Sequence, residues 1–216
     1  MANLFSVEYV LIQIFDYPLS LIEVSGTVFY ILSVLFISQK NILTWPTGIL
    51  SGVLYLLIFY QIQLYADAFL QIYFISISLI AWKNWKQEEM NFNTIHVSFS
   101  GSRTILFWAF LSLFSSLGFY LFLKDIHIYF PVIFPKEASY PLADSFTTIM
   151  SIIGMYLMSK KKTESWMYWA IVDAISTYLY WMKNVKLLSI EFCVFFFFAI
   201  YGFRKWILFE KKPISE

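Results

Sequence analysis

The feature that most constrains this chain is a series of apolar blocks, each about 20 residues long, separated by short polar clusters. A helix rises about 1.5 Å per residue, so a block of this length crosses the roughly 30 Å hydrocarbon core of a bilayer. In lipid, only helices and closed barrels satisfy all of their backbone hydrogen bonds internally. The pattern therefore predicts an all-α polytopic membrane protein.

Composition supports a lipid environment and excludes one class of partner. Of the 216 residues, 60% are hydrophobic and only 13% are charged, whereas soluble domains carry about a quarter charged residues. So few charges cannot cover a surface that faces water. The net charge of +1 and the lack of a basic stripe argue against a nucleic-acid partner.

The apolar blocks define seven predicted transmembrane spans, the fifth of which could begin nearer Tyr140. They are Leu19–Ser38, Ile42–Gln61, Tyr65–Trp85, Thr104–Leu123, Ser145–Ser159, Trp166–Met182 and Leu187–Trp206. With the two termini on opposite sides, eleven of the 15 Lys and Arg residues fall on the side of the C-terminus. The positive-inside rule then places the N-terminus outside and the C-terminus in the cytoplasm.

Two sequence echoes at one offset predict an internal repeat. Ser38 to Trp45 aligns with Ser159 to Trp166, and Ala81 to Trp85 aligns with Gly202 to Trp206, both 121 residues apart. Each copy holds three spans, and the fourth span between them makes the copies parallel, giving a 3+1+3 plan. Small transporters share this plan, with substrate sites at the repeat interface; a duplicated bundle without a pathway is the alternative.

This plan divides the chain into five predicted segments. They are an N-terminal interfacial segment (1–18), a first repeat (19–85), a linker with the fourth span (86–144), a second repeat (145–206) and a cytoplasmic tail (207–216). Phe5, Tyr9, Ile12 and Phe15 recur at helical spacing, so the first segment is predicted to hold a short interfacial helix.

Polar residues deep in the spans are the candidates for a binding site, because they are costly in lipid unless paired or facing a cavity. Span six places five such residues on one helical stripe: Trp166, Trp169, Asp173, Ser176 and Tyr180. Flat rings beside a carboxylate suit a planar cationic ring. Gln71 in span three and Asn184 after span six are predicted to bind polar, ribose-like groups, although Gln71 could instead bond across helices.

A second set of residues near the span ends is predicted to form a gate or rim. The set comprises Trp45, Tyr65, Asp67, Trp82, Trp85 and Glu191. For Trp45, Trp85, Trp166 and Trp206, a place in the aromatic belt at the membrane interface is the alternative. Gly48 and Gly52 form a small-xxx-small face for close helix packing.

The sequence offers no catalytic chemistry. It has no Walker A loop, no Cys/His set for a metal and no nucleophile–base pair at matched depth. We expect no enzyme activity, no cofactor and no metal.

Several of these motifs together resemble the PnuC family of vitamin transporters. Four motifs lie in the first predicted repeat: Trp45-Pro46-Thr47-Gly48, Gln61-Ile62-Gln63-Leu64-Tyr65-Ala66-Asp67, Leu70-Gln71-Ile72-Tyr73 and Trp82-Lys83-Asn84-Trp85. Three lie in the second: Glu164-Ser165-Trp166, Ser189-Ile190-Glu191 and Gly202-Phe203-Arg204-Lys205-Trp206. The resemblance runs from about Leu21 to Trp206. The chain departs from the family pattern at Asp173, where an amide residue is usual, and at Ala81, where a glycine is usual.

The resemblance implies uptake of nicotinamide riboside by facilitated diffusion into a bacterium through its inner membrane, with phosphorylation by a cytosolic kinase trapping the product. It also implies a 3+1+3 fold like that of the SWEET sugar transporters, assembly as a homotrimer, and ligand contacts at Gln71 and the span-six stripe. Thiamine is the alternative substrate, since related proteins carry it. A non-transporting membrane scaffold or enzyme is the alternative of another class. No mid-membrane acid pair suggests a proton relay, so we expect no ion coupling.

Overall fold

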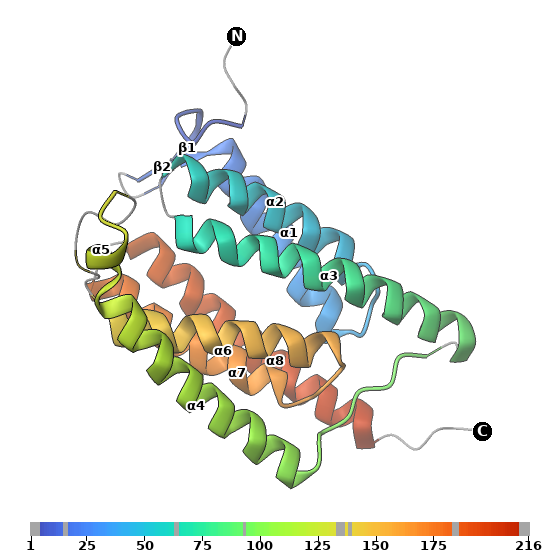
Figure 1. Cartoon of the computed structure of the whole chain (residues 1–216). Coiled ribbons are helices and arrows are strands. Elements are labelled where there is room, and N and C mark those ends of the chain that lie inside the picture. The colour runs from blue at the N-terminus through green and yellow to red at the C-terminus, as the bar shows by residue number, and fades with distance from the viewer. Residues whose placement is uncertain are drawn as a thin grey trace. The chain divides into compact units, whose positions relative to one another are not determined.

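A computed structural model describes residues 5–14, 17–62, 65–92, 94–132, 137, 140–182 and 186–211 of the chain. In these ranges the chain forms eight helices and one two-stranded hairpin (Figure 1). The elements are β1 (Val10–Ile14), β2 (Tyr17–Ser20), α1 (Leu21–Ser38), α2 (Thr44–Gln61), α3 (Tyr65–Phe92), α4 (Ser102–Lys124), α5 (Ile126–Tyr129), α6 (Pro141–Ser159), α7 (Ser165–Met182) and α8 (Lys186–Lys211).

The helical class and the positions of the seven long helices are as predicted. α3 and α8 extend further than expected, to Phe92 and Lys211 rather than to Trp85 and Trp206. In α3 the added turns begin with Lys-Gln-Glu-Glu after Trp85. These residues are good helix formers, so α3 continues past the point where its hydropathy falls. The residues added to α8 are Ile-Leu-Phe-Glu-Lys, so there the apolar span itself is longer than predicted.

Four helices in the described ranges are long and apolar enough to cross a membrane: α1, α4, α6 and the Leu188–Lys211 part of α8. α2, α3 and α7 are not among them. The plan of seven spans therefore remains a proposal.

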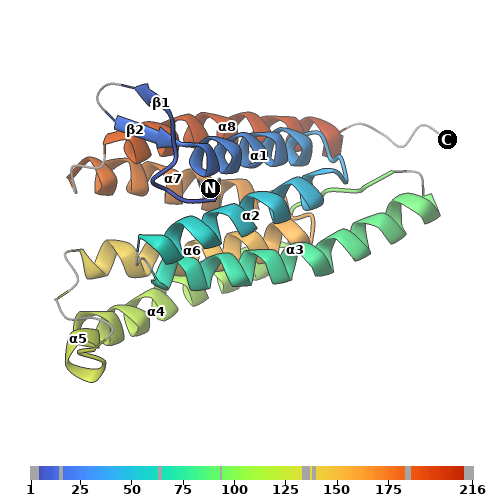
Figure 2. The same ribbon diagram turned by 90° about the horizontal axis from the view of Figure 1, so that it is seen from above.

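The predicted N-terminal helix is wrong. Residues Val10 to Ile14 form a strand that pairs antiparallel with Tyr17 to Ser20, and Figure 2 shows β2 leading directly into α1. The β-branched residues Val10, Ile12 and Ile14 alternate with other types, and this period of two suits a strand. The side chain of Gln61, at the end of α2, holds the N-terminal segment. Its Nε2 donates to Phe5 O at 2.8 Å, and its Oε1 accepts from the Val7 N–H at 3.0 Å.

The chain divides into two compact units, and the first comprises Met1–Val97 with Arg204–Glu216. Here α2 packs against both α1 and α3. The two glycines on α2 allow this packing: a Cβ at Gly48 would lie 3.0 Å from Ser33 Oγ, and one at Gly52 would lie 2.9 Å from Ile75 Cγ1. The predicted small-residue face is thus present, with each glycine admitting a different neighbour.

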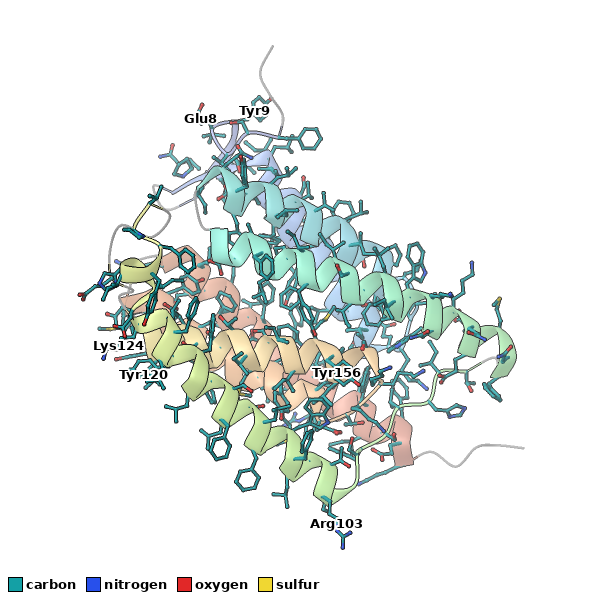
Figure 3. The ribbon with its side chains drawn as sticks, in the orientation of Figure 1. Glu8, Tyr9, Arg103, Tyr120, Lys124 and Tyr156 are labelled. Atoms are coloured by element: carbon teal, nitrogen blue, oxygen red, sulfur yellow. The ribbon has the colours of Figure 1, made fainter. Side chains whose placement is uncertain are left out.

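The second unit, Ser98–Phe203, contains α4 as well as α6 and α7. α6 packs against both α4 and α7, and the Trp108 and Tyr156 rings lie 5.3 Å apart between α4 and α6. Arg103 and Lys124 project from opposite ends of α4 (Figure 3). By its contacts, α4 lies in the same compact unit as α6 and α7.

The two segments predicted to be repeats agree in their helix bounds and turns at the 121-residue offset. α2 and α7 begin and end 121 residues apart, as do the starts of α3 and α8. The α1–α2 and α6–α7 turns share one conformation: Lys40 and Lys161 have φ of 59° and 61°, a region that usually favours glycine at the end of a helix. Their N–H groups donate to equivalent carbonyls three residues back. The same local structure is built twice.

Burial contradicts the aromatic-belt interpretation for Trp45, Trp85, Trp166 and Trp206. All four side chains are fully buried, whereas belt residues must face the headgroups. Trp45 and Trp85 meet edge to face at 5.2 Å. The Trp206 indole donates to Ile37 O at 3.0 Å within unit 1. These rings form the interior near the helix ends.

Candidate binding site

The predicted stripe on α7 faces the interior of unit 2. Asp173 is only 3% exposed, and Trp166 and Ser176 are also buried, while Trp169 and Tyr180 are half-buried. The other face of α7 is open, with Tyr178 67% and Trp181 58% exposed. The helix is therefore apolar outside and polar inside. A helix that faces lipid and lines a site has this pattern.

Asp173 lacks a partner for its charge in the described part of unit 2. Thr177 Oγ1 donates to the Asp173 backbone carbonyl at 2.7 Å, but no described residue donates a hydrogen bond to the carboxylate. An ionised carboxylate with neither partner nor water is strongly unfavourable in a protein interior. A ligand with a positive charge would complete this site electrostatically.

Two aromatic side chains on the stripe flank this carboxylate along the helix. Gly154 of α6 leaves space beside Trp169, since a Cβ there would lie 3.7 Å from the indole Nε1 and 3.0 Å from Tyr168 Cβ. Tyr180 stacks on Phe192 of α8, with ring centroids 5.2 Å apart and planes at 5°. Ser189 Oγ also donates to Thr177 O at 2.6 Å, which joins α8 to α7 at this level.

Trp166 has a clear packing contact at the first turn of α7. A Cβ on Gly202 of α8 would lie 2.4 Å from its ring, so the ring fills the space that this glycine leaves. The equivalent position in the first copy is Ala81, which is also buried.

The remaining predicted site residues fall in unit 1, near the ends of the stripe, or outside the described part. Gln71 and Asp67 are half-buried one turn apart on α3, and Gln71 Oε1 lies 3.8 Å from a Cβ built on Gly52. Trp82 is 37% exposed, and Glu191 is half-buried on α8. Asn184 and the side chain of Tyr65 lie outside the described residues.

The sequence interpretation assigned no role to Glu164, which the structure shows to be 2% exposed. Its carboxylate oxygens accept the Ser100 N–H at 3.2 and 3.3 Å. Next to it, Ser98 exchanges backbone hydrogen bonds with Lys161 and Thr163. The one available signal was a lone acid after three lysines, which by itself also suits a solvated turn.

A mainly helical chain with several helices apolar enough to cross a membrane belongs to the class of multi-pass membrane proteins. The profile of the nicotinamide mononucleotide transporter family matches residues 20–208, so the chain belongs to this family of transporters, which are not enzymes.

Relatives and a solved structure agree with this assignment. Proteins named nicotinamide riboside transporter PnuC from Escherichia coli K12 and Shigella flexneri are each 28% identical over 95% of this chain and 94% of their own length. The Neisseria mucosa protein of that name is 21% identical, over 86% of this chain and 72% of its own. The crystal structure of the vitamin B3 transporter PnuC shares the fold, with a TM-score of 0.63 at 20% identity, covering 87% of this chain and 80% of that one.

Proposed function

We propose that this protein takes up nicotinamide riboside through a bacterial inner membrane by facilitated diffusion. The observation that carries the proposal is the buried Asp173 carboxylate, which no described residue neutralises and which lies on one helical stripe with Trp169 and Tyr180. Nicotinamide riboside carries a flat, positively charged pyridinium ring. Such a ring gains from stacking and cation–π attraction and supplies the charge that Asp173 lacks.

The same carboxylate favours the riboside over the mononucleotide after which the family is described. A mononucleotide adds a phosphate group that Asp173 would repel. Four of the long helices, α1, α2, α6 and α7, contain no lysine or arginine. The cations of the described helices lie towards helix ends, where they are suited to the membrane surfaces rather than to a buried phosphate.

The test compares two ligands of nearly equal shape and different charge. Reduced nicotinamide riboside has a neutral ring, so purified wild-type protein should bind the oxidised form at least tenfold more tightly. In Asp173→Asn, which keeps the size of the side chain, this preference should largely disappear. Asp125→Asn, in the α4–α5 turn, serves as the control and should retain the preference. Equal binding of the two forms by the wild type would refute the role of Asp173.

Thiamine remains the alternative substrate, because its thiazolium ring is also cationic and would satisfy Asp173. Titration of the same protein with thiamine separates the two possibilities. Tight binding of thiamine without binding of the riboside would replace our proposal. A non-transporting scaffold or enzyme would show uptake unaffected by loss of Trp169 and Asp173, in variants that fold normally.

The transport mode is tested in liposomes. Without ion coupling, internal riboside should rise only to the external concentration, whether or not a proton gradient is applied. Encapsulated riboside kinase with ATP should then drive further accumulation by trapping the phosphorylated product. We also propose a homotrimer, which native mass spectrometry would detect as three times the 25.6 kDa chain mass.

A further inference from the structure

The surface of α3 carries a hollow of about 310 Å³, which includes the predicted rim residue Trp82 but no residue of the α7 stripe. It is lined by Leu79, Trp82, Lys83 and Lys86. These residues are spaced at intervals of three, one and three along the helix, so they share one face. All four side chains are exposed. The volume lies at the lower end of the range for small-molecule sites, about 300–1,000 Å³.

The hollow lies where the exposed side chains of α3 change from mainly apolar to mainly polar. Before it, the exposed side chains are the apolar Phe69 and Ile72 and the small Ser76, whose hydroxyl donates to the Ile72 carbonyl of the same helix. After it, the helix continues to Phe92 with mostly polar residues, Met90 being the other apolar one. If α3 spans the bilayer as proposed, this change marks the cytoplasmic headgroup level, where Trp82 has the amphipathic ring typical of that depth.

The two lysines have no counter-charge among the residues that the structure describes. Neither Lys83 nor Lys86 has a hydrogen bond or ion pair with any residue in the described part of the chain, and no acid lines the hollow. The acids that follow on α3 do not pair with them either: Glu88 accepts the His96 N–H at 3.0 Å, and Glu89 is exposed. Two cationic side chains beside the apolar Leu79 and Trp82 suit a ligand with an anionic head and an apolar tail.

We propose that this hollow binds the headgroup of an anionic phospholipid of the inner leaflet. Lys83 and Lys86 contact the phosphate oxygens, the Trp82 indole lies at the level of the glycerol backbone, and Leu79 contacts the start of an acyl chain. The inference rests on the proposed spanning of α3 but not on the identity of the substrate.

Native mass spectrometry of the full chain in detergent, titrated with phosphatidylglycerol or with phosphatidylcholine of the same acyl chains, tests the proposal. The wild type should retain phosphatidylglycerol preferentially. Each lysine near an anionic headgroup contributes about fivefold in affinity, so Lys83→Gln with Lys86→Gln should weaken phosphatidylglycerol binding about thirtyfold. Binding of phosphatidylcholine should not change.

A matched control removes two other exposed cations. Arg103→Gln with Arg204→Gln changes the net charge equally, yet leaves the hollow intact, and should keep the lipid. An equal loss in this control would show a general charge effect and overturn the proposal, as would displacement of the lipid by inorganic phosphate alone. Riboside binding in the lysine double variant should persist, so the lipid site and the proposed function can fail independently.

Discussion

Gly202 leaves the space that the Trp166 ring occupies, and this contact yields a stability prediction. A Cβ at this position would lie within 2.4–2.5 Å of three atoms of the indole. Gly202→Ala should therefore destabilise the protein by about 1–3 kcal/mol through overpacking. Chemical unfolding in detergent, followed by circular dichroism, measures the change.

Gly118→Ala provides the matched control for that experiment. Gly118 also lies in a helix, α4, but no atom comes within 4 Å of a Cβ built on it. Here the better helix propensity of alanine should raise stability by up to about 1 kcal/mol. If both variants were stabilised, the close contact between Gly202 and Trp166 would not exist in the folded protein.

Trp169 and Trp181 lie on the same helix, but we expect their substitution to affect riboside binding differently. Trp169 is half-buried on the α7 stripe, whereas Trp181 is 58% exposed on the other face. Stacking and cation–π attraction amount to about 1–2 kcal/mol at a desolvated site. Trp169→Ala should thus weaken riboside binding about tenfold in a fluorescence or calorimetric titration. Trp181→Ala should leave it unchanged, and a similar loss in both would point to a folding defect instead.

At the scale of elements, the segment between α3 and α4 depends on Glu164. The carboxylate holds the Ser100 N–H, and Ser98 pairs with the α6–α7 turn. A hydrogen bond to a charged group contributes about 1.5–3 kcal/mol. Glu164→Ala should speed amide hydrogen exchange at residues 98–101 by about 10- to 100-fold. Glu89→Ala, at an exposed site on α3, should not, and unchanged exchange in both would show that the turn holds the segment without Glu164.

The long helices could be predicted closely because hydropathy and helix formation coincide in them. α7 was expected at Trp166–Met182 and begins one residue earlier. The prediction failed where the two properties separate: the polar end of α3 is helical without being apolar, and the N-terminal segment is apolar without being helical. In that segment Phe5, Tyr9 and Ile12 fit a helical spacing, while Val10, Ile12 and Ile14 fit a strand. The pattern alone does not decide between the two.

The candidate site was predictable to the extent that it lies on one helix. Helical spacing places Asp173 and Ser176 on the same face, and the cost of charge in lipid indicates that this face turns inward. The burial of Glu164 could not be read in the same way. It depends on Ser100, which is 64 residues away in the sequence, and a single sequence without pairing information does not reveal that contact.

At the scale of the whole molecule, the two predicted repeats are alike in their turns and different in their helix faces. The turns at Lys40 and Lys161 have the same backbone conformation. The Lys40 side chain also donates a hydrogen bond from Nζ to Ile95 O at 2.8 Å. Position 43 of the first copy is an exposed leucine, while the equivalent Glu164 is buried. Copy two has Trp169 and Asp173 where copy one has Gly48 and Gly52. The two turns thus share a conformation while the helix faces differ, and one of these faces carries the candidate site.

Whether the copies are parallel depends on α4, and this gives the last prediction. Three helices are an odd number, so a second copy would be inverted unless a further span precedes it. α4 is long and apolar enough for that role, with Arg103 and Lys124 at its two ends. If α4 crosses the bilayer, Met90 and Tyr129, which precede and follow it, lie on opposite sides of the membrane.

Cysteine labelling of intact cells tests this in a Cys193→Ala background, because the native Cys193 is exposed on α8. An impermeant maleimide should label Tyr129→Cys from outside. It should reach Met90→Cys and Glu210→Cys only after permeabilisation, since the excess of Lys and Arg on that side places it in the cytoplasm. Labelling of Met90→Cys and Tyr129→Cys from the same side would mean that α4 does not span. The repeats would then be inverted, and the transport pathway would have to be built from copies of opposite direction.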